Sequence, residues 1–229
     1  MYNLSMGILY IVSTPIGNME DMTQRAIEIL SRVDFILTED TRHSGRLLKK
    51  LLINKPLISF HEHNEVFKIS EVTSKLKEGH NLALISDAGT PTLSDPGFKL
   101  VRECIKENIK VTPIPGASSI LSALVASGLP TDSFVFLGYV PKKDGKKKLF
   151  YEKILKQLTE FKITVIFFES PHRLNRTLED LESNFPQRFL SIARELTKIN
   201  EEITYGSVKE VADKFKNRKV KGEITLVLH

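Results

Sequence analysis

Short apolar runs alternate with amphipathic segments throughout the first half of the chain. The runs predict strands at residues 8–12, 35–37, 57–60, 82–85 and 110–114. The segments between these runs carry apolar residues at helical spacing, for example over residues 26–33. Strands that alternate with helices are typical of an α/β domain with a doubly wound parallel sheet.

The second half repeats the pattern after a turn at residues 127–132. Apolar runs predict further strands at residues 134–137, 164–168, 189–193 and 223–228. Two helices are predicted between them, one with Leu174, Leu178 and Leu181 on its apolar face and one over residues 208–215. Ile120, Leu121, Leu124 and Val125 are expected to form the buried face of an earlier helix.

The loop at residues 86–97 has an unusual density of small and turn-forming residues. It follows the buried strand 82–85 and precedes a helix whose apolar positions are expected to be Phe98, Val101, Cys104 and Ile105. Ser94 or Asp95 could cap that helix, with Pro96 in its first turn. In open parallel sheets ligands bind at such strand-to-helix loops, so this loop is the first candidate binding site.

Two more loops of this kind lie at residues 13–18 and 115–119. Neither contains the G-x-G-x-x-G pattern of dinucleotide-binding proteins, and the chain has no Walker A motif. The basic segment at residues 45–50 is interpreted as a solvated helix face.

Charged residues follow three of the predicted strands, in the segments 39–43, 61–65 and 169–173. Asp40 or Thr41 could cap the next helix, yet Arg42 and His43 place positive charge where the helix dipole disfavours it. A bound anion would remove that conflict. Ser170 and Pro171 could begin another helix, and Asn64 could cap a third. His61 and His63 lack the spacing of a zinc-binding helix, so no metal site is expected.

The net charge of the 229 residues is +5 at pH 7. Basic and acidic residues are equal in number over residues 1–117, so the excess comes from the second half. Five lysines at residues 142–148 indicate a solvated loop that could contact a polyanion such as RNA. Cys104 is the only cysteine and is expected in the core. No membrane-spanning run or basic leader is evident, so a cytoplasmic location is expected.

Several of these segments together resemble the small-subunit ribosomal RNA 2'-O-methyltransferase I family, a branch of the tetrapyrrole-methylase fold class. They are Thr14-Pro15-Ile16-Gly17-Asn18, Glu39-Asp40-Thr41-Arg42, Ser86-Asp87-Ala88-Gly89-Thr90-Pro91, Pro115-Gly116-Ala117-Ser118, Glu169-Ser170-Pro171-His172-Arg173 and Arg194-Glu195-Leu196-Thr197-Lys198. The resemblance implies two α/β domains, residues 1–116 with a parallel sheet and residues 117–229 with a mixed sheet, and a cofactor in the cleft between them. Some family members continue into a further C-terminal segment.

The family resemblance also implies methyl transfer from S-adenosylmethionine to the 2'-hydroxyl of a cytidine in the decoding region of 16S ribosomal RNA. The expected partner is small-subunit RNA within the 30S particle, and a homodimer is expected. The implied cofactor-binding residues are Pro15, Ser86, Asp87, Ala88, Gly89, Thr90, Pro91, Pro115, Gly116, Ala117, Ser118 and Ser119. The candidates for a general base are Glu39, Asp40, Glu169 and His172. The candidates for RNA contact are Arg42, His61, Asn64, Lys146, Lys147, Arg173 and Arg194.

Two alternatives remain open. The first is a tetrapyrrole methyltransferase of the same fold, although a basic second half suits RNA better. The second is an RNA-binding module without catalysis. Internal ion pairing is an equally good explanation for Arg194.

Overall fold

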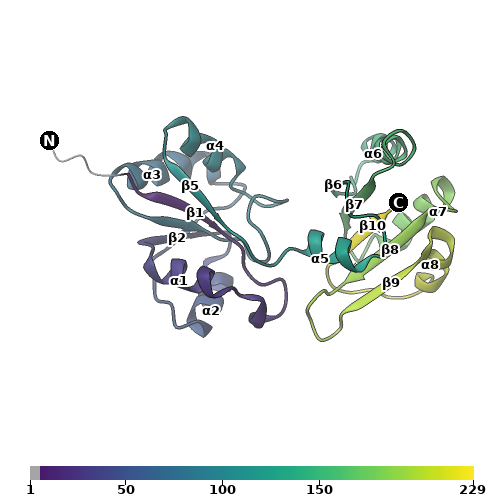
Figure 1. Cartoon of the computed structure of the whole chain (residues 1–229), viewed down its shortest axis with the longest axis horizontal. Coiled ribbons are helices and arrows are strands. Elements are labelled where there is room, and N and C mark those ends of the chain that lie inside the picture. Colours follow the sequence, from purple (N-terminus) through teal and green to yellow (C-terminus); the bar gives the residue numbers. More distant parts are fainter. Residues whose placement is uncertain (1–5) are drawn as a thin grey trace. The chain divides into compact units, whose positions relative to one another are not determined.

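A computed structural model of the chain describes residues 6–229, which divide into two compact units (Figure 1). Unit 1 is Met1–Ser118 and unit 2 is Ser119–His229. This division falls two residues after the predicted domain boundary. Each unit has its own five-stranded sheet.

Unit 1 contains a wholly parallel sheet with the strand order β3-β2-β4-β1-β5. Its strands are β1 (Ile8–Val12), β2 (Phe35–Thr38), β3 (Leu57–Ser59), β4 (Leu82–Leu84) and β5 (Lys110–Ile114). Its helices are η1 (Met19–Asp21), α1 (Gln24–Arg32), α2 (Thr41–Lys50), α3 (Glu65–Lys77) and α4 (Phe98–Lys106). The five predicted strands are thus confirmed to within a residue or two.

The helices of unit 1 cover both faces of its sheet (Figure 1). Leu30 of α1 and Leu48 of α2 belong to one apolar cluster, and Leu76 of α3 and Leu100 of α4 belong to another. β4 is fully buried, as expected for a strand covered on both faces. Cys104 is buried in the second cluster, as predicted.

Unit 2 contains a mixed sheet with the strand order β6-β7-β10-β8-β9, in which only β6 and β7 run parallel. Its strands are β6 (Phe134–Tyr139), β7 (Thr164–Glu169), β8 (Phe189–Arg194), β9 (Glu202–Ser207) and β10 (Ile224–Leu228). Its helices are α5 (Ser119–Ala126), α6 (Asp144–Lys156), η2 (Gln157–Phe161), α7 (Leu174–Asn184) and α8 (Val208–Phe215). The hydrophobic pattern did not predict β9, because this edge strand has no fully buried residue.

Two predicted helix starts are wrong. α4 begins at Phe98 and α7 at Leu174, three or four residues after the predicted caps, and neither has a side-chain cap. Buried glutamates accept hydrogen bonds from the backbone just before each helix instead. The Glu65 carboxylate accepts from Gly97 N at 3.3 Å, and Glu169 accepts from Ser170 N at 2.5 Å.

The predicted buried faces of two helices also need correction. In α4, Phe98 and Ile105 are exposed, and Leu100 is buried in their place. In α5, Leu121 and Val125 are exposed, because the helix turns Ile120, Ala123 and Leu124 inward.

The lysine-rich segment 142–148 is not a loop throughout, because α6 begins at Asp144. The apolar residues Phe150, Tyr151 and Ile154 anchor this helix in the core of unit 2. An acidic residue in the first turn also suits the helix dipole.

Candidate active site

Three loops of unit 1 meet at the carboxyl ends of the adjacent strands β4, β1 and β5. Thr14 and Gly89 exchange two backbone hydrogen bonds, with N···O distances of 2.9 and 3.1 Å. The hydroxyl oxygens of Ser13 and Thr90 lie 2.9 Å apart, and Thr90 also donates to Ala117 O at 3.2 Å. The loops at residues 13–18, 86–91 and 115–118 therefore form one connected structure.

The small residues of these loops are needed for this close approach. A Cβ at Gly116 would lie 3.0 Å from Ser13 Cβ, so a larger residue would push the first and third loops apart. Ser86 is buried, and its hydroxyl lies within hydrogen-bonding distance of Ala88 O and Gly89 O. Ser86 thus holds the turn that carries Asp87.

Several predicted cofactor-binding residues shape this structure, while others line its surface. Ser86, Gly89 and Pro91 are buried, so they act through the backbone or through packing. Pro115 and Gly116 are exposed. The half-buried members of the set are Pro15, Asp87, Ala88, Thr90, Ala117, Ser118 and Ser119, the last of which begins α5 in unit 2.

Carboxylates gather beside these loops. Glu39 follows β2, the neighbour of β4, and its carboxylate accepts a hydrogen bond from the backbone of Asp87. Burial, and then the like charges of Asp95 and Asp87, raise the pKa of Glu39 to about 7. Asp87 Oδ1 is buried and has no hydrogen-bond partner among residues 6–229. An unsatisfied buried acceptor is costly unless a ligand or water supplies a donor.

The rest of the loop after Asp87 has an unusual backbone conformation. Thr92 and Ser94 have φ values of +74° and +66°, and Gly97, with φ of +124°, occupies the N-cap of α4. A β-branched residue in this region is a conformational outlier. Such strain occurs preferentially at functional sites, and here it lies in the loop that brings Asp95 close to Glu39.

Asp40 serves as the helix cap that the sequence predicted. Its carboxylate accepts hydrogen bonds from the backbone of Arg42 at 2.8 Å and of His43 at 3.4 Å. These contacts, the one to Arg42 first, lower the pKa of Asp40. The Arg42 guanidinium lies 3.5 Å from the same carboxylate and remains 89% exposed. The Asp40 carboxylate therefore already gives Arg42 an anionic neighbour.

His61 and Asn64 lie in the loop between β3 and α3. Asn64 does not cap α3 with its side chain, contrary to the prediction. Its side-chain oxygen accepts a hydrogen bond from His61 N at 2.8 Å, and its side-chain nitrogen donates one to Ser59 O at 3.1 Å. These two hydrogen bonds hold the loop in place. His61 Nδ1 is buried and has no hydrogen-bond partner among the described residues.

The motif at residues 169–173 forms a polar network within unit 2, in which Arg173 Nε is buried and has no hydrogen-bond partner among residues 6–229. Glu169 is buried and contacts the backbone of Ser170, the hydroxyl of Thr177 and the guanidinium of Arg173, each at 2.5 Å. Arg173 also donates to Val140 O at 2.9 Å. His172 is exposed. Both oxygens of Glu169 are engaged, so this group stabilises the fold.

Arg194 is similarly engaged. It forms an ion pair of 3.0 Å with Glu202 and donates to Lys221 O and Asn200 O, each at 3.1 Å. This arrangement agrees with the internal ion pairing that the sequence left open. Lys146 is exposed on α6.

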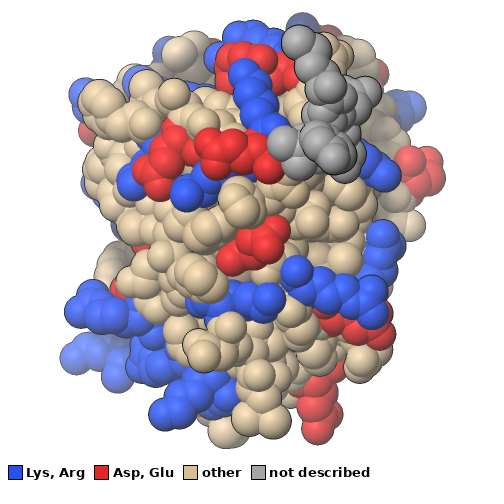
Figure 2. Space-filling view, turned by 90° about the vertical axis from the view of Figure 1, so that its left-hand side faces the viewer, with Lys and Arg blue, Asp and Glu red and all other residues tan. Residues whose placement is uncertain are grey.

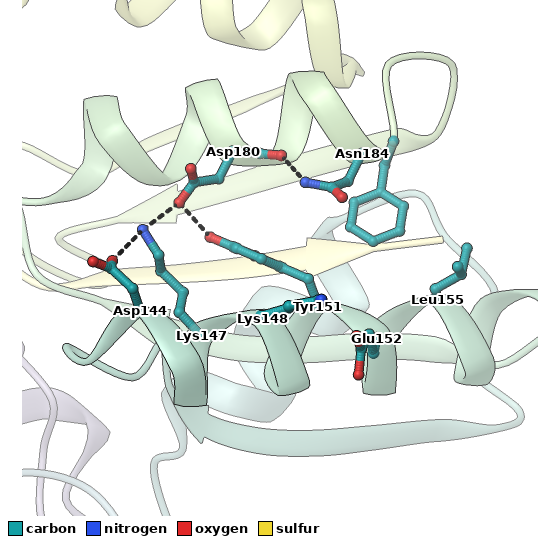
Figure 3. Close-up of a pocket in the computed structure, with 9 residues that line it drawn as sticks. Asp144, Lys147, Lys148, Tyr151, Glu152, Leu155, Asp180 and Asn184 are labelled. Atoms are coloured by element: carbon teal, nitrogen blue, oxygen red, sulfur yellow. Dashed lines mark hydrogen bonds and ion pairs between the residues drawn. The ribbon is translucent and has the colours of Figure 1, made fainter.

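Lys147 forms an ion pair of 2.8 Å with Asp180, which also accepts a hydrogen bond from Tyr151 (Figure 3). Burial, followed by the charge of Asp180, raises the pKa of Tyr151. These groups line a pocket of about 390 Å³ between α6 and α7. The Lys147 ammonium thus has a structural partner in α7, and this pocket does not include the loops of unit 1.

Two features are absent from residues 6–229. No group of three or more His, Cys, Asp or Glu side chains there could hold a metal ion. No helix in the same range has the length and apolar character required to cross a membrane.

Comparison with known proteins identifies the family. A model of the Tetrapyrrole (Corrin/Porphyrin) Methylases matches residues 8–212. A Synechocystis protein named ribosomal RNA small subunit methyltransferase I is 47% identical over 224 residues, which are 97% of this chain and 79% of that protein. The Thermotoga maritima protein of the same name is 46% identical over 97% of this chain and 98% of its own length.

Two solved structures of methyltransferases share the fold. Uroporphyrin-III-C-methyltransferase from Thermus thermophilus has a TM-score of 0.63 at 20% identity and covers 96% of this chain and 94% of its own. The methyltransferase CobJ has a TM-score of 0.69 at 17% identity and covers 97% of this chain and 93% of its own. The predicted fold class and the predicted family are confirmed. The chain belongs to the tetrapyrrole (corrin/porphyrin) methylases and, within them, to the ribosomal RNA small subunit methyltransferase I family.

Proposed function

We propose that this chain methylates small-subunit ribosomal RNA, with S-adenosylmethionine as donor and the 2'-hydroxyl of a cytidine ribose in the decoding region of 16S RNA as acceptor. Relatives with 46–47% identity are named as small-subunit ribosomal RNA methyltransferases. The two methyltransferases of known structure are no more than 20% identical and support the fold alone. The observation that carries the proposal is the junction of three loops beside the Glu39 and Asp87 carboxylates.

The residues of this junction suit S-adenosylmethionine. The cofactor supplies a methyl group on a positively charged sulfur, and a cluster of carboxylates is electrostatically complementary to a cation. The unpartnered Asp87 Oδ1 could accept a hydrogen bond from a hydroxyl or amino group of a nucleoside. Thr90 and Gly116 keep the loops close enough to provide a narrow, polar surface.

Glu39 is the best candidate for the general base among the four predicted residues. Asp40 is engaged as a helix cap, and both oxygens of the buried Glu169 already have partners. His172 is an exposed residue of unit 2. A carboxylate with a pKa of about 7 is matched to proton transfer near neutral pH. In this proposal Glu39 would accept the proton of the ribose 2'-hydroxyl while the new oxygen–carbon bond forms and the sulfur–methyl bond breaks, which leaves a neutral thioether.

The substrate contacts proposed for unit 1 are Arg42 and His61. Asn64 would act by holding the loop of His61. In unit 2, Lys146 stays a candidate, because it is exposed. Lys147, Arg173 and Arg194 are engaged within their own unit and are proposed to support the fold around such contacts.

The proposal also includes the assembled 30S particle as the substrate and a homodimer as the active form. The family resemblance supports both. Methyl transfer to 30S particles should exceed transfer to free 16S RNA, and light scattering should give about twice the chain's 26.0 kDa mass. Preference for naked RNA, or a monomer mass, would contradict these two parts separately.

The proposed reaction is tested by mapping methylated nucleotides in 16S RNA from cells with and without this protein. We expect one ribose methyl group on a decoding-region cytidine to disappear with the protein and to return when purified protein and S-adenosylmethionine are added. An unchanged methylation map would contradict the proposal. Methylation of a porphyrinoid precursor by the purified protein would favour the tetrapyrrole alternative, and absence of cofactor binding in calorimetry would favour the non-catalytic one.

A further inference from the structure

The exposed face of α2 is strongly basic. Arg42, His43, Arg46, Lys49 and Lys50 are all exposed, and the helix contains no acidic residue. At 3.6 residues per turn these side chains cover roughly 120° of the helix circumference, over a length of about 12 Å. Figure 2 shows Lys and Arg side chains gathered in the lower part of one face of the molecule, the end of unit 1 at which Figure 1 draws α1 and α2.

Some other cations of unit 1 are paired with carboxylates, whereas three of the four Lys and Arg side chains on α2 have no such partner among residues 6–229. Lys68, Lys77 and Lys106 each form an ion pair with a glutamate within 3.0 Å. Within the part of the chain that the structure describes, no ion pair involves Arg46, Lys49 or Lys50. Because α2 carries four Lys and Arg side chains and no acidic residue of its own, positive charge is concentrated along this helix.

The position of α2 connects this face to the candidate base. The helix begins at Thr41, two residues after Glu39, and Asp40 between them caps it. A polyanion that follows the basic stripe toward the helix N-terminus would therefore approach Glu39. We infer that the stripe of Arg46, Lys49 and Lys50 binds the phosphate backbone of the RNA substrate and guides the target ribose toward Glu39; this inference rests on the proposed function.

RNA fits this surface better than a lipid membrane does. An interfacial helix needs a free apolar face to insert into the headgroup region. The apolar side of α2 is already used, because Leu48 is buried in the core cluster that also contains Ile53 and Leu30. Phosphate binding needs only exposed cations at spacings that a nucleic-acid backbone can reach.

The test uses a variant with Arg46→Gln, Lys49→Gln and Lys50→Gln. The control variant, Lys209→Gln, Lys216→Gln and Lys219→Gln, removes the same charge from exposed positions in unit 2. Fluorescence anisotropy measures binding to 16S RNA between 50 and 200 mM salt. Loss of three single-strand phosphate contacts should reduce the slope of log K against log salt by about 2, so the wild type should lose about 20-fold more affinity over this range than the variant.

Binding of S-adenosylmethionine, measured by calorimetry, should stay the same in both variants. An unchanged salt slope in the α2 variant, or an equal change in the control, would overturn the inference while leaving the proposed function intact. Absence of RNA binding by the wild type would instead remove the proposed function and this inference together. Loss of binding to vesicles of phosphatidylserine and phosphatidylcholine without loss of RNA binding would identify the stripe as a membrane contact and overturn the inference.

Discussion

Glu39 in unit 1 and Glu169 in unit 2 have similar positions in the sequence, but their carboxylates have very different neighbours in the structure. Each comes at the end of a buried strand and is followed by an arginine three or four residues later. Glu169 contacts the Arg173 guanidinium, a hydroxyl and a backbone amide. Glu39 instead lies near the like charges of Asp95 and Asp87, and its pKa is raised to about 7.

The difference lies in what the neighbouring loops bring to each glutamate. In unit 1, Asp40 takes up the N-terminal amides of α2 and the nearby guanidinium of Arg42, so Glu39 is left with other carboxylates. In unit 2, Glu169 itself accepts the hydrogen bond from Ser170 N before α7 and forms the ion pair with Arg173. The comparison shows that Glu39 is free of the helix N-terminus because Asp40 caps α2, whereas Glu169 accepts the backbone hydrogen bond itself.

Replacement of the proposed base should have the largest effect on activity. Glu39→Gln should lower the rate of methyl transfer by about 10²–10⁴-fold, the usual contribution of a general base. The affinity for S-adenosylmethionine should change little, because Gln keeps the size and the acceptor oxygen. Single-turnover transfer to 30S particles measures the rate, and Glu62→Gln, an exposed carboxylate of unit 1, is the control. A rate close to that of the wild type would show that Glu39 is not the general base.

Replacement of Glu169, the glutamate compared with Glu39, should lower the stability of the fold. Glu169→Ala leaves the half-buried Arg173 without its carboxylate and should reduce the free energy of unfolding by about 2–4 kcal/mol, at or just below the range for fully buried pairs. Urea denaturation measures this loss. Glu223→Ala, which removes an exposed partner of Lys198, should cost only about 0–1 kcal/mol. Equal losses in the free energy of unfolding for the two substitutions would show that the Glu169 network stabilises unit 2 no more than an exposed ion pair does.

Asp87 should affect cofactor binding. Asp87→Asn halves the acceptor capacity of a half-buried side chain whose Oδ1 is buried and unsatisfied, and hydrogen bonds to charged groups are worth about 1.5–3 kcal/mol. We therefore expect affinity for S-adenosylmethionine to fall by roughly 10–100-fold in calorimetry. Asp21→Asn, an exposed aspartate of η1, is the control. Unchanged affinity would place the cofactor away from this side chain.

The smallest effect concerns stability and pH. The pKa of Glu39 is higher in the folded protein than its ordinary value of 4.5, so the wild type loses stability as pH rises toward 7. Glu39→Gln removes this loss. The melting temperature of the variant relative to the wild type should therefore increase from about pH 4.5 to 7 and stay level above that. Differential scanning fluorimetry across this range measures it, and a pH-independent difference would argue against the carboxylate cluster.

The strand pattern and the loop positions could be predicted from the sequence because they depend on local periodicity. Strand β4 is wholly buried and β1 and β5 are partly buried; each contains an apolar run, and the small residues after the strands indicate tight turns. The starts of α4 and α7 could not be predicted, because glutamates that are distant in sequence or at a strand end replace the nearby hydroxyls. β9 gave no signal, because an edge strand need not alternate.

The roles within the candidate site depended on tertiary contacts. Glu39, Asp40 and Glu169 all carry carboxylates, and only their neighbours distinguish the proposed proton acceptor from a helix cap and an ion-pair partner. The lysine run was similarly ambiguous. Asp180, which lies in α7, turns Lys147 from an exposed cation into part of an internal network.

The pH dependence of kcat/KM for methyl transfer is the most direct test of the central claim that Glu39 accepts a proton in the unit 1 site. In the wild type, activity should rise with pH through about 7 and then level off, because Glu39 must be deprotonated. Glu39→Gln should abolish this step, and Asp95→Asn should move it to lower pH, since one like charge is removed. A step that persists unchanged in Glu39→Gln would contradict the account.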